Sequence, residues 1–212
     1  MPAKEPPPRS PRRAPTGGER RRDPERTKAR IIDAAKIEFS AKGYAATRVA
    51  DIADRAGVNK QLISYYFGGK EGLHAELNNQ WRETGSAIAD LERPLDAVVA
   101  DFVMSTLHER EAARMLVWSN MSTDEGAFRK DPAQVAFLRG QVDNLRRRQE
   151  SGELPADLDP AHLMLALFAA ASAVVALPRI AEIVCDEDPS LPEFTEKYAD
   201  QIARLVKHLS GS

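Results

Sequence analysis

The sequence holds one cysteine, Cys185, so it cannot form an internal disulfide or a metal site built from several thiolates. We expect this thiol to be buried in a structural role. The four histidines are far apart and lack the H-E-x-x-H spacing that places two zinc ligands on one helix face. Paired catalytic groups and a phosphate-binding glycine loop are not recognisable either. The sequence therefore predicts no metal, no cofactor and no catalytic site.

Long apolar runs are also missing. No run approaches the roughly 20 residues that a membrane-spanning helix needs. The N-terminus has arginines and prolines but no apolar signal region. We therefore predict a cytoplasmic protein without a membrane segment. The 212 residues can bury a substantial core, either as one domain or as a small domain joined to a larger one.

Charge is divided unevenly along the chain. Residues 1–72 hold 16 Lys and Arg against 9 Asp and Glu, a net of +7, whereas residues 73–212 have a net of −9. Such a division suits a protein whose one end approaches phosphate groups. Much of the excess comes from residues 1–22, which are rich in arginine and proline and hold almost no large apolar groups. We predict a disordered basic arm there, which adds at most a nonspecific attraction to nucleic acid.

The stretch from Thr47 to Lys70 predicts two short helices joined by a tight turn. Ile52 and Ala56 form one apolar pair at i, i+4 spacing, Gly57 interrupts the pattern, and Ile63 with Phe67 forms a second pair. The outward side of the second helix carries polar groups, namely Lys60, Gln61, Ser64 and Tyr65. A helix-turn-helix, whose second helix enters the DNA major groove, has this form.

Capping residues predict where the neighbouring helices begin and end. Asp23-Pro24 marks the start of a helix that runs to about Lys42 and ends at Gly43. Thr47 and Asn59 are the expected caps of the two short helices. Lys70 begins a fourth helix of about twenty residues, as judged from its apolar spacing.

The rest of the chain is predicted to be helical, so the fold class is all-α. Asp131-Pro132 and Asp159-Pro160 repeat the pattern of a cap followed by a proline. The expected helices run from Pro94 through Met104, from about Glu109 to Met121, from Pro132 to Ser151, from Pro160 to just before Pro178, and from Phe194 to Leu209. Residues 122–126 and 185–192 are expected to be loops.

The pattern from Arg30 to Leu73, I-I-D-A-A…F…K-G-Y…T…I-A…A-G-V-N-K…Y-Y-F-G-G-K-E-G-L, closely resembles the TetR family of bacterial transcriptional regulators. The resemblance implies a three-helix DNA-binding domain, a linking fourth helix, a variable helical ligand domain and a homodimer. On this basis we divide the chain into a basic arm (1–22), a helix-turn-helix DNA-binding domain (23–68) and a ligand-binding and dimerisation domain (69–210).

Candidate DNA-binding residues follow from how a helix-turn-helix docks, with the start of its second helix against base edges and flanking groups against phosphates. Lys60 suits guanine, Gln61 suits adenine and Leu62, if exposed, suits a thymine methyl, while Arg48 is a further base reader. The remaining candidates have donors for phosphate oxygens, and the backbone contacts implied by the resemblance fall at them: Thr47, Ser64, Tyr65, Tyr66 and Lys70. Core packing beside Phe67 is an equally good interpretation of Tyr66. The chain departs from the common family pattern at Gln61, Leu62 and Ser64.

The resemblance also implies a dimer interface and a ligand site in the second half of the chain. The alanine-rich run from Leu165 to Leu177 and the last helix are expected to pair with their copies, although an internal core is the alternative. The candidates for apolar walls around a ligand are Phe102, Trp118, Met121, Phe137, Met164 and Phe168. The polar candidates are Asn120, Gln141, Asn144 and His162. For each of these residues, ordinary core packing is the competing interpretation.

Together these patterns predict a repressor that binds a palindromic operator in double-stranded DNA as a homodimer and is released by a small-molecule effector. A ligand-independent regulator and an activator remain alternatives. A nonspecific nucleic-acid binder that works through the arginine arm is a third, and an enzyme that carries the same motif is a fourth.

Overall fold

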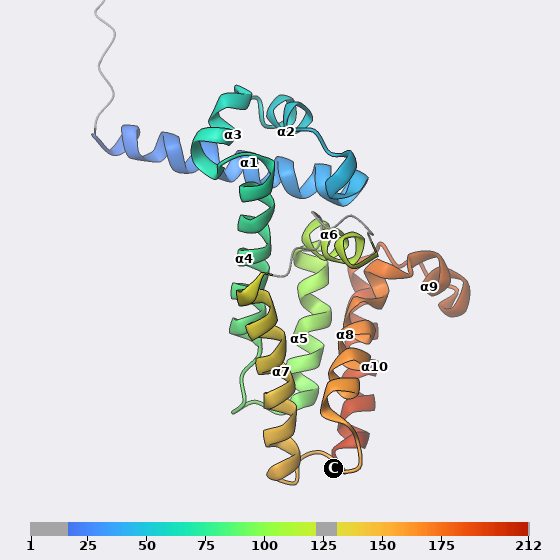
Figure 1. The fold of residues 1–212 in the computed structure, drawn as a ribbon. Coiled ribbons are helices and arrows are strands. Elements are labelled where there is room, and N and C mark those ends of the chain that lie inside the picture. The colour runs from blue at the N-terminus through green and yellow to red at the C-terminus, as the bar shows by residue number, and fades with distance from the viewer. Residues whose placement is uncertain (1–16, 122–130, 212) are drawn as a thin grey trace, which may run out of the picture.

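The computed structural model describes residues 17–121 and 131–211, together with the side chains from Pro24 onward. Within these residues the fold is all-α, as predicted, with ten helices and no strand (Figure 1). The helices are α1 (Gly17–Ala46), α2 (Val49–Ala56), α3 (Lys60–Phe67), α4 (Lys70–Ile88), α5 (Leu95–His108), α6 (Arg110–Met121), α7 (Pro132–Glu150), α8 (Pro160–Ala176), α9 (Pro178–Cys185) and α10 (Pro192–Leu209).

Helices α1, α2 and α3 pack around one apolar cluster at one end of the molecule (Figure 1). Phe39 of α1, Ile52 of α2 and Ile63 of α3 are fully buried in it, together with Leu73 from the start of α4. Burial of each large side chain contributes about 1.5–3 kcal/mol. Because α2 and α3 have only 8 residues each, this shared core is what holds them in place.

A buried carboxylate ties the end of α1 to α2. Glu38 is almost fully buried and pairs with Lys42 at 2.7 Å and with Arg55 at 2.7 Å. Hydrogen bonds from these two cations lower the pKa of Glu38. The hydroxyl of Thr47 donates to the carbonyl oxygens of Glu38 and Gly43, so the corner between the two helices is closed by polar as well as apolar contacts.

The larger body contains α4 to α10. In Figure 1, α4, α5, α7, α8 and α10 run along the body, α6 crosses it beneath α1, and α9 projects to one side. A second apolar cluster joins α5, α7 and α10 through Leu95, Val99, Leu145 and Val206. Helix α4 belongs to both parts, because it begins at the end of α3 and extends down the body.

Several sequence predictions about local structure were wrong. Helix α1 begins at Gly17, within the predicted disordered arm, and Pro24 lies inside it. The run Glu19–Arg22 consists of good helix formers, which favour this earlier start. Residues 1–16, the rest of that arm, lie outside the described residues, as does the loop predicted at 122–126. The predicted break at Gly43 is, by contrast, confirmed: its φ of 73° and ψ of 171° are non-helical and kink the chain there, and a short helical piece follows as far as Ala46.

Two further corrections concern helix caps and the cysteine. Thr47 was expected to cap α2, but the residue directly before α2 is Arg48, which makes no side-chain cap hydrogen bond. The Thr47 hydroxyl donates to the Gly43 carbonyl at the corner between α1 and α2 instead. No helix was predicted over residues 178–185, but α9 lies there. It begins at Pro178, because proline fits the first position of a helix. Cys185 ends this projecting helix and is exposed, not buried.

Within the described residues, no single helix has the length and apolar composition to cross a membrane. Helices α8 and α9 satisfy both conditions only when taken together, and they are bent by 86° where they meet.

Candidate functional site

Helix α3 is fixed at both ends and along one side. At its start, the Asn59 side chain accepts a hydrogen bond from the Gln61 N–H at 2.9 Å, which confirms the predicted cap. At its end, Gly68 has φ 72°, a left-handed conformation that favours glycine. Ile63 anchors the helix in the core. The outward side of α3 is therefore presented in a defined orientation.

The residues of α3 divide into an exposed face and a packed face. Lys60, Gln61 and Ser64 are exposed, and Tyr65 is 80% exposed. Leu62 and Tyr66 are instead partly buried against the three-helix core. The thymine contact of Leu62 was predicted only for an exposed side chain, and Leu62 is half-buried. For Tyr66 the packing interpretation is the one that the structure supports.

The residues that flank α3 also differ in their availability. Arg48 is exposed in extended backbone just before α2. Thr47 is buried with its hydroxyl donating to two backbone carbonyls, so this hydroxyl is not presented to a phosphate as predicted. Lys70 is partly buried. Its ammonium nitrogen donates to the Ala45 carbonyl at 3.3 Å and lies 4.3 Å from the centre of the Tyr44 ring. Its ammonium is thus held at the junction of α1, α3 and α4.

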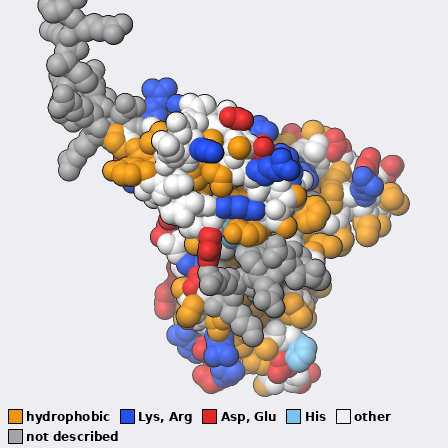
Figure 2. Space-filling model, turned by 45° about the horizontal axis from the view of Figure 1, so that its top comes forward, with side chains coloured by type: hydrophobic (Ala, Val, Ile, Leu, Met, Phe, Trp, Pro, Cys, Tyr) orange, Lys and Arg blue, Asp and Glu red, His pale blue; other side chains and the backbone are white. Residues whose placement is uncertain are grey.

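Lys and Arg side chains gather on the face formed by α1, α2 and α3, interrupted by a few acidic groups (Figure 2). Arg30 of α1 is committed within the protein, because its guanidinium donates to the carbonyls of Ala56 and Gly57 at the turn between α2 and α3. Lys60 and Arg48 make no hydrogen bond or ion pair among the described residues. These two cations are free to meet an anionic partner.

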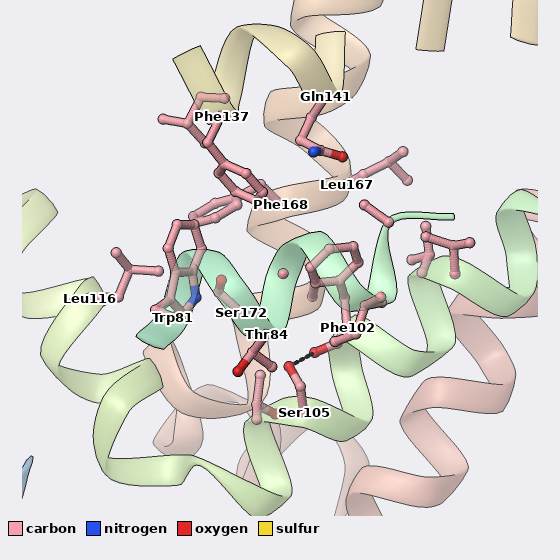
Figure 3. Close-up of a pocket in the computed structure, with 18 of the residues that line it drawn as sticks. Trp81, Thr84, Phe102, Ser105, Leu116, Phe137, Gln141, Leu167, Phe168 and Ser172 are labelled. Carbon is pink, nitrogen blue, oxygen red and sulfur yellow. Dashed lines mark hydrogen bonds between the residues drawn. The ribbon is translucent and has the colours of Figure 1, made fainter. Parts of the chain in front are cut away.

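The body contains a cavity of about 350 Å³ that is enclosed mainly by α4, α5, α7 and α8 (Figure 3). Six of the predicted ligand residues line it, and they come from three helices: Phe102, Phe137, Gln141, Asn144, Met164 and Phe168. Its volume lies within the range of about 300–1,000 Å³ that small-molecule sites occupy.

Four predicted ligand residues lie elsewhere, which corrects the sequence interpretation. Trp118 packs near Gly43 of α1, and Met121 is 77% exposed at the end of α6. Asn120 is exposed and donates to the Leu116 carbonyl. His162 is exposed at the start of α8 and pairs with Asp159, the cap of that helix. Helix periodicity does not show which apolar or polar side chains the tertiary packing turns inward.

Trp81 of α4 is the principal residue that sequence reasoning missed at the cavity. Its ring makes edge contacts with Phe137 at 5.4 Å and Phe168 at 6.3 Å between ring centroids. Leu77, Trp81, Thr84 and Ile88 line the cavity at helical spacing along α4. That spacing is the signal that indicates an inward stripe on this helix.

One end of the cavity reaches α1. Lys36 of α1 lines the cavity, and its ammonium lies 2.6 Å from the carboxylate of Glu109, between α5 and α6. The site therefore has two parts: an exposed polar face on α3, and a mostly apolar cavity that contacts both α1 and α4.

Residues 31–77 match the family described as bacterial regulatory proteins, tetR family, and residues 95–204 match the family described as tetracyclin repressor-like, C-terminal domain. The chain belongs to the TetR family. It is 30% identical over 168 residues to the HTH-type transcriptional repressor SCO4008 of Streptomyces coelicolor, an alignment that covers 77% of this chain and 85% of that protein. This TetR-family chain is therefore a transcriptional regulator with a helix-turn-helix domain and a C-terminal domain of the kind that binds ligands.

Solved structures share the TetR-family fold at lower identity. The putative transcriptional regulator SCO4942 from Streptomyces coelicolor is 24% identical, with a TM-score of 0.65, and the match covers 86% of this chain and 97% of that one. The transcriptional regulator FadR from Bacillus subtilis, in complex with stearoyl-CoA, is 19% identical, with a TM-score of 0.60, and the match covers 87% and 98%. At these identities the likeness concerns the fold alone.

Proposed function

We propose that this chain is a cytoplasmic, homodimeric repressor that binds a palindromic operator through α3 and leaves it when a small molecule occupies the cavity. The observation that carries the proposal is the exposed polar face of α3, held by the Asn59 cap and the buried Ile63. The name of the relative from Streptomyces coelicolor, a transcriptional repressor, supports repression as the outcome of binding.

We assign DNA contacts from exposure and chemistry. Lys60 and Gln61 lie at the start of α3 and are exposed, so they suit base edges, and Arg48 suits a further base contact. Ser64 and Tyr65 present hydroxyls on the same exposed face for phosphate oxygens. Lys70 adds positive charge at the start of α4, beside that face. Residues 23–68 form the DNA-binding domain in this division, and residues 69–210 form the effector and dimer domain.

A second copy of the chain is proposed to cover apolar side chains on α8 and α10. Leu165 is 66% exposed and Leu205 is 56% exposed, although both belong to helices of the main body. Ala161 and Ala169 on α8 are also exposed and allow a close approach of helices. A two-fold dimer would place its two α3 helices about one DNA turn, or a multiple of it, apart.

The cavity and the DNA-binding face share structural elements, which supports effector control. Helix α4 lines the cavity and begins at Lys70, after only Gly68 and Gly69 at the end of α3. Lys36 brings α1 to the same cavity. A ligand that binds one arrangement of α4 and α1 more tightly than another shifts the spacing of the two α3 helices. The FadR structure in complex with stearoyl-CoA supports the capacity of this fold to hold a ligand.

The DNA assignment is tested by fluorescence anisotropy of the full chain on DNA from its own upstream region and on unrelated duplexes. Lys60→Ala should reduce the preference for the upstream DNA, because one good base contact contributes about 1–3 kcal/mol of discrimination. Lys70→Ala should weaken binding to both kinds of DNA alike. Lys207→Ala, at the far end of α10, removes the same charge and should change neither. Uniform losses from Lys60→Ala and Lys70→Ala would refute this division of roles.

The dimer is tested by sedimentation equilibrium. Leu165→Glu puts a charge on the exposed face of α8 and should yield monomers that keep the helical circular dichroism of the parent. A parent chain that sediments as a monomer at micromolar concentration would contradict the dimer.

A further inference from the structure

The cavity has an aromatic wall that is assembled from several helices. Trp81 of α4 packs edge-on against Phe137 of α7 and Phe168 of α8, and Phe102 of α5 lies across the same space (Figure 3). Aromatic rings in such a wall favour flat, apolar groups that stack on them or pack against their edges. The body of a bound molecule is therefore expected to be apolar and at least partly aromatic.

Both cations that line the cavity already have partners. Lys36 pairs with Glu109 at 2.6 Å. Arg148 is almost fully buried and pairs with Glu153 at 2.6 Å, while its second terminal nitrogen donates to the carbonyls of Asp90 and Arg93. A ligand carboxylate would have to displace one of these partners. The carboxylates that line the cavity, Glu83, Asp90 and Glu109, are all exposed to solvent, so none is buried where it could offset the cost of burying a ligand ammonium. A charged group that enters without such an exchange stays unpaired and costs free energy.

Neutral hydrogen-bond donors in the cavity are, by contrast, available. Within residues 17–121 and 131–211, the Trp81 indole N–H, the Thr84 hydroxyl and the Ser172 hydroxyl make no hydrogen bond to the protein. The Gln141 oxygen accepts from Asn144 at 3.4 Å, which leaves its NH₂ group free to donate. Figure 3 shows these side chains among the aromatic rings. Donors of this kind pair with carbonyl, ether, ester or hydroxyl oxygens.

We infer that the cavity binds an uncharged, largely aromatic molecule whose oxygen atoms accept hydrogen bonds from Gln141 and the indole of Trp81. The inference rests on the proposed role of the cavity as the effector site. It deepens that proposal by naming the chemical class of the effector. The paired cations disfavour an anionic molecule of the same shape, and the lack of a buried carboxylate among the described residues of the cavity disfavours a cationic one. The neutral donors favour oxygen-bearing molecules over plain hydrocarbons.

Four probes with one biphenyl body separate charge from hydrogen bonding. They are 4-acetylbiphenyl, biphenyl-4-carboxylate, 4-phenylbenzylammonium and 4-ethylbiphenyl, each titrated into the full chain by isothermal calorimetry. The ketone should bind most tightly. The hydrocarbon should bind about three- to tenfold more weakly, because it lacks one hydrogen bond. The two charged probes should bind more weakly than the ketone by about tenfold or more.

Two variants locate the binding and identify the donor. The chain has two tryptophans, so Trp118→Phe, outside the cavity, leaves Trp81 as the only indole. In that variant the ketone should protect Trp81 fluorescence from quenching by acrylamide. Gln141→Leu removes the amide donor but leaves the Trp81 indole, so it should reduce the preference for the ketone over 4-ethylbiphenyl.

The outcomes distinguish this inference from the proposed function. Tighter binding by the carboxylate or the ammonium, binding of the ketone without protection of Trp81, or binding by none of the probes would each overturn the inference. If a charged probe binds in the cavity and releases DNA, the inferred ligand class is wrong while effector control stands. If the ketone binds as expected and the affinity for DNA is unchanged, the ligand class stands and effector control is wrong.

Discussion

The ammonium of Lys36 lies 2.6 Å from the carboxylate of Glu109, so one ion pair joins α1 of the DNA-binding helices to the turn between α5 and α6. Lys36 is 20% exposed and Glu109 is 48% exposed, which places the pair at the surface edge of the cavity.

A double-mutant cycle on this pair should give a coupling free energy of about 0.2–1 kcal/mol, as partly exposed ion pairs do. Lys36→Met and Glu109→Gln, alone and together, are compared by urea unfolding. The coupling should shrink as salt is added, because salt screens the pair. Strictly additive effects at low salt would show that the contact does not stabilise the junction.

Gly72, in the first turn of α4, is predicted to tolerate no side chain. A Cβ there would lie 1.7 Å from the carbonyl oxygen of Phe67, a backbone atom that cannot move without shifting the end of α3. Gly72→Ala should therefore lower the free energy of unfolding by about 1–3 kcal/mol and weaken DNA binding. Gly140→Ala in α7 is the matched control, since its Cβ meets nothing within 4 Å and alanine is the better helix former. Equal stability of the two variants would contradict this role for Gly72.

His74 should make the protein less stable in mild acid. Burial, with a smaller contribution from the charge of Lys70, lowers the pKa of His74 from 6.5 to about 4. As the pH falls from 6.5 toward 4, the unfolded chain takes up a proton at this position and the folded chain does not, so stability is lost across that interval. The loss due to His74 amounts to about 3 kcal/mol.

The variant His74→Gln isolates this contribution from that of the carboxylates. Its free energy of unfolding, measured in urea at several pH values, should fall less steeply between pH 6.5 and 4 than that of the parent. His208→Gln, at an exposed position on α10, should keep the parent slope. A His74→Gln curve parallel to that of the parent would show that the folded protein protonates His74 as readily as the unfolded chain does.

Removal of the cap on α3 should weaken both stability and DNA binding. Asn59→Ala loses the hydrogen bond to the Gln61 N–H and should cost about 0.5–2 kcal/mol of stability. Asn59→Ser keeps a capping oxygen and should stay close to the parent in thermal unfolding and in anisotropy on DNA. If serine and alanine are equally harmful, the asparagine acts through some contact other than the cap.

Local sequence signals predicted the helices whose ends are set by neighbouring residues. Asn59, Asp131 and Asp159 each accept hydrogen bonds from the first turn of the helix that follows them, as predicted, because a cap needs only the few residues around it. The apolar pair Ile63 and Phe67 likewise faces the core. The fold class and the helix-turn-helix therefore followed from the sequence.

The residues that line the cavity, and the roles of side chains at the corner between α1 and α2, depend on tertiary packing. They could not be predicted in full from the sequence. Trp118 and Trp81 are both indoles on helices, yet only Trp81 faces the space between α4, α5, α7 and α8. Thr47 was expected to cap α2, but its hydroxyl donates a hydrogen bond to the Glu38 carbonyl of the preceding helix. Cys185 is exposed because α9 projects from the body, and apolar spacing alone does not show that direction.

Sequencing of random DNA duplexes selected by the full chain tests DNA recognition by α3 most directly. Enrichment of an inverted repeat, with half-sites about one helical turn or a multiple apart, is the predicted result. The variant that combines Lys60→Ala with Gln61→Ala should lose or change the half-site sequence while its fold is retained. Enrichment of no sequence, or of the same sequence by the parent and this variant, would contradict recognition of an operator through α3.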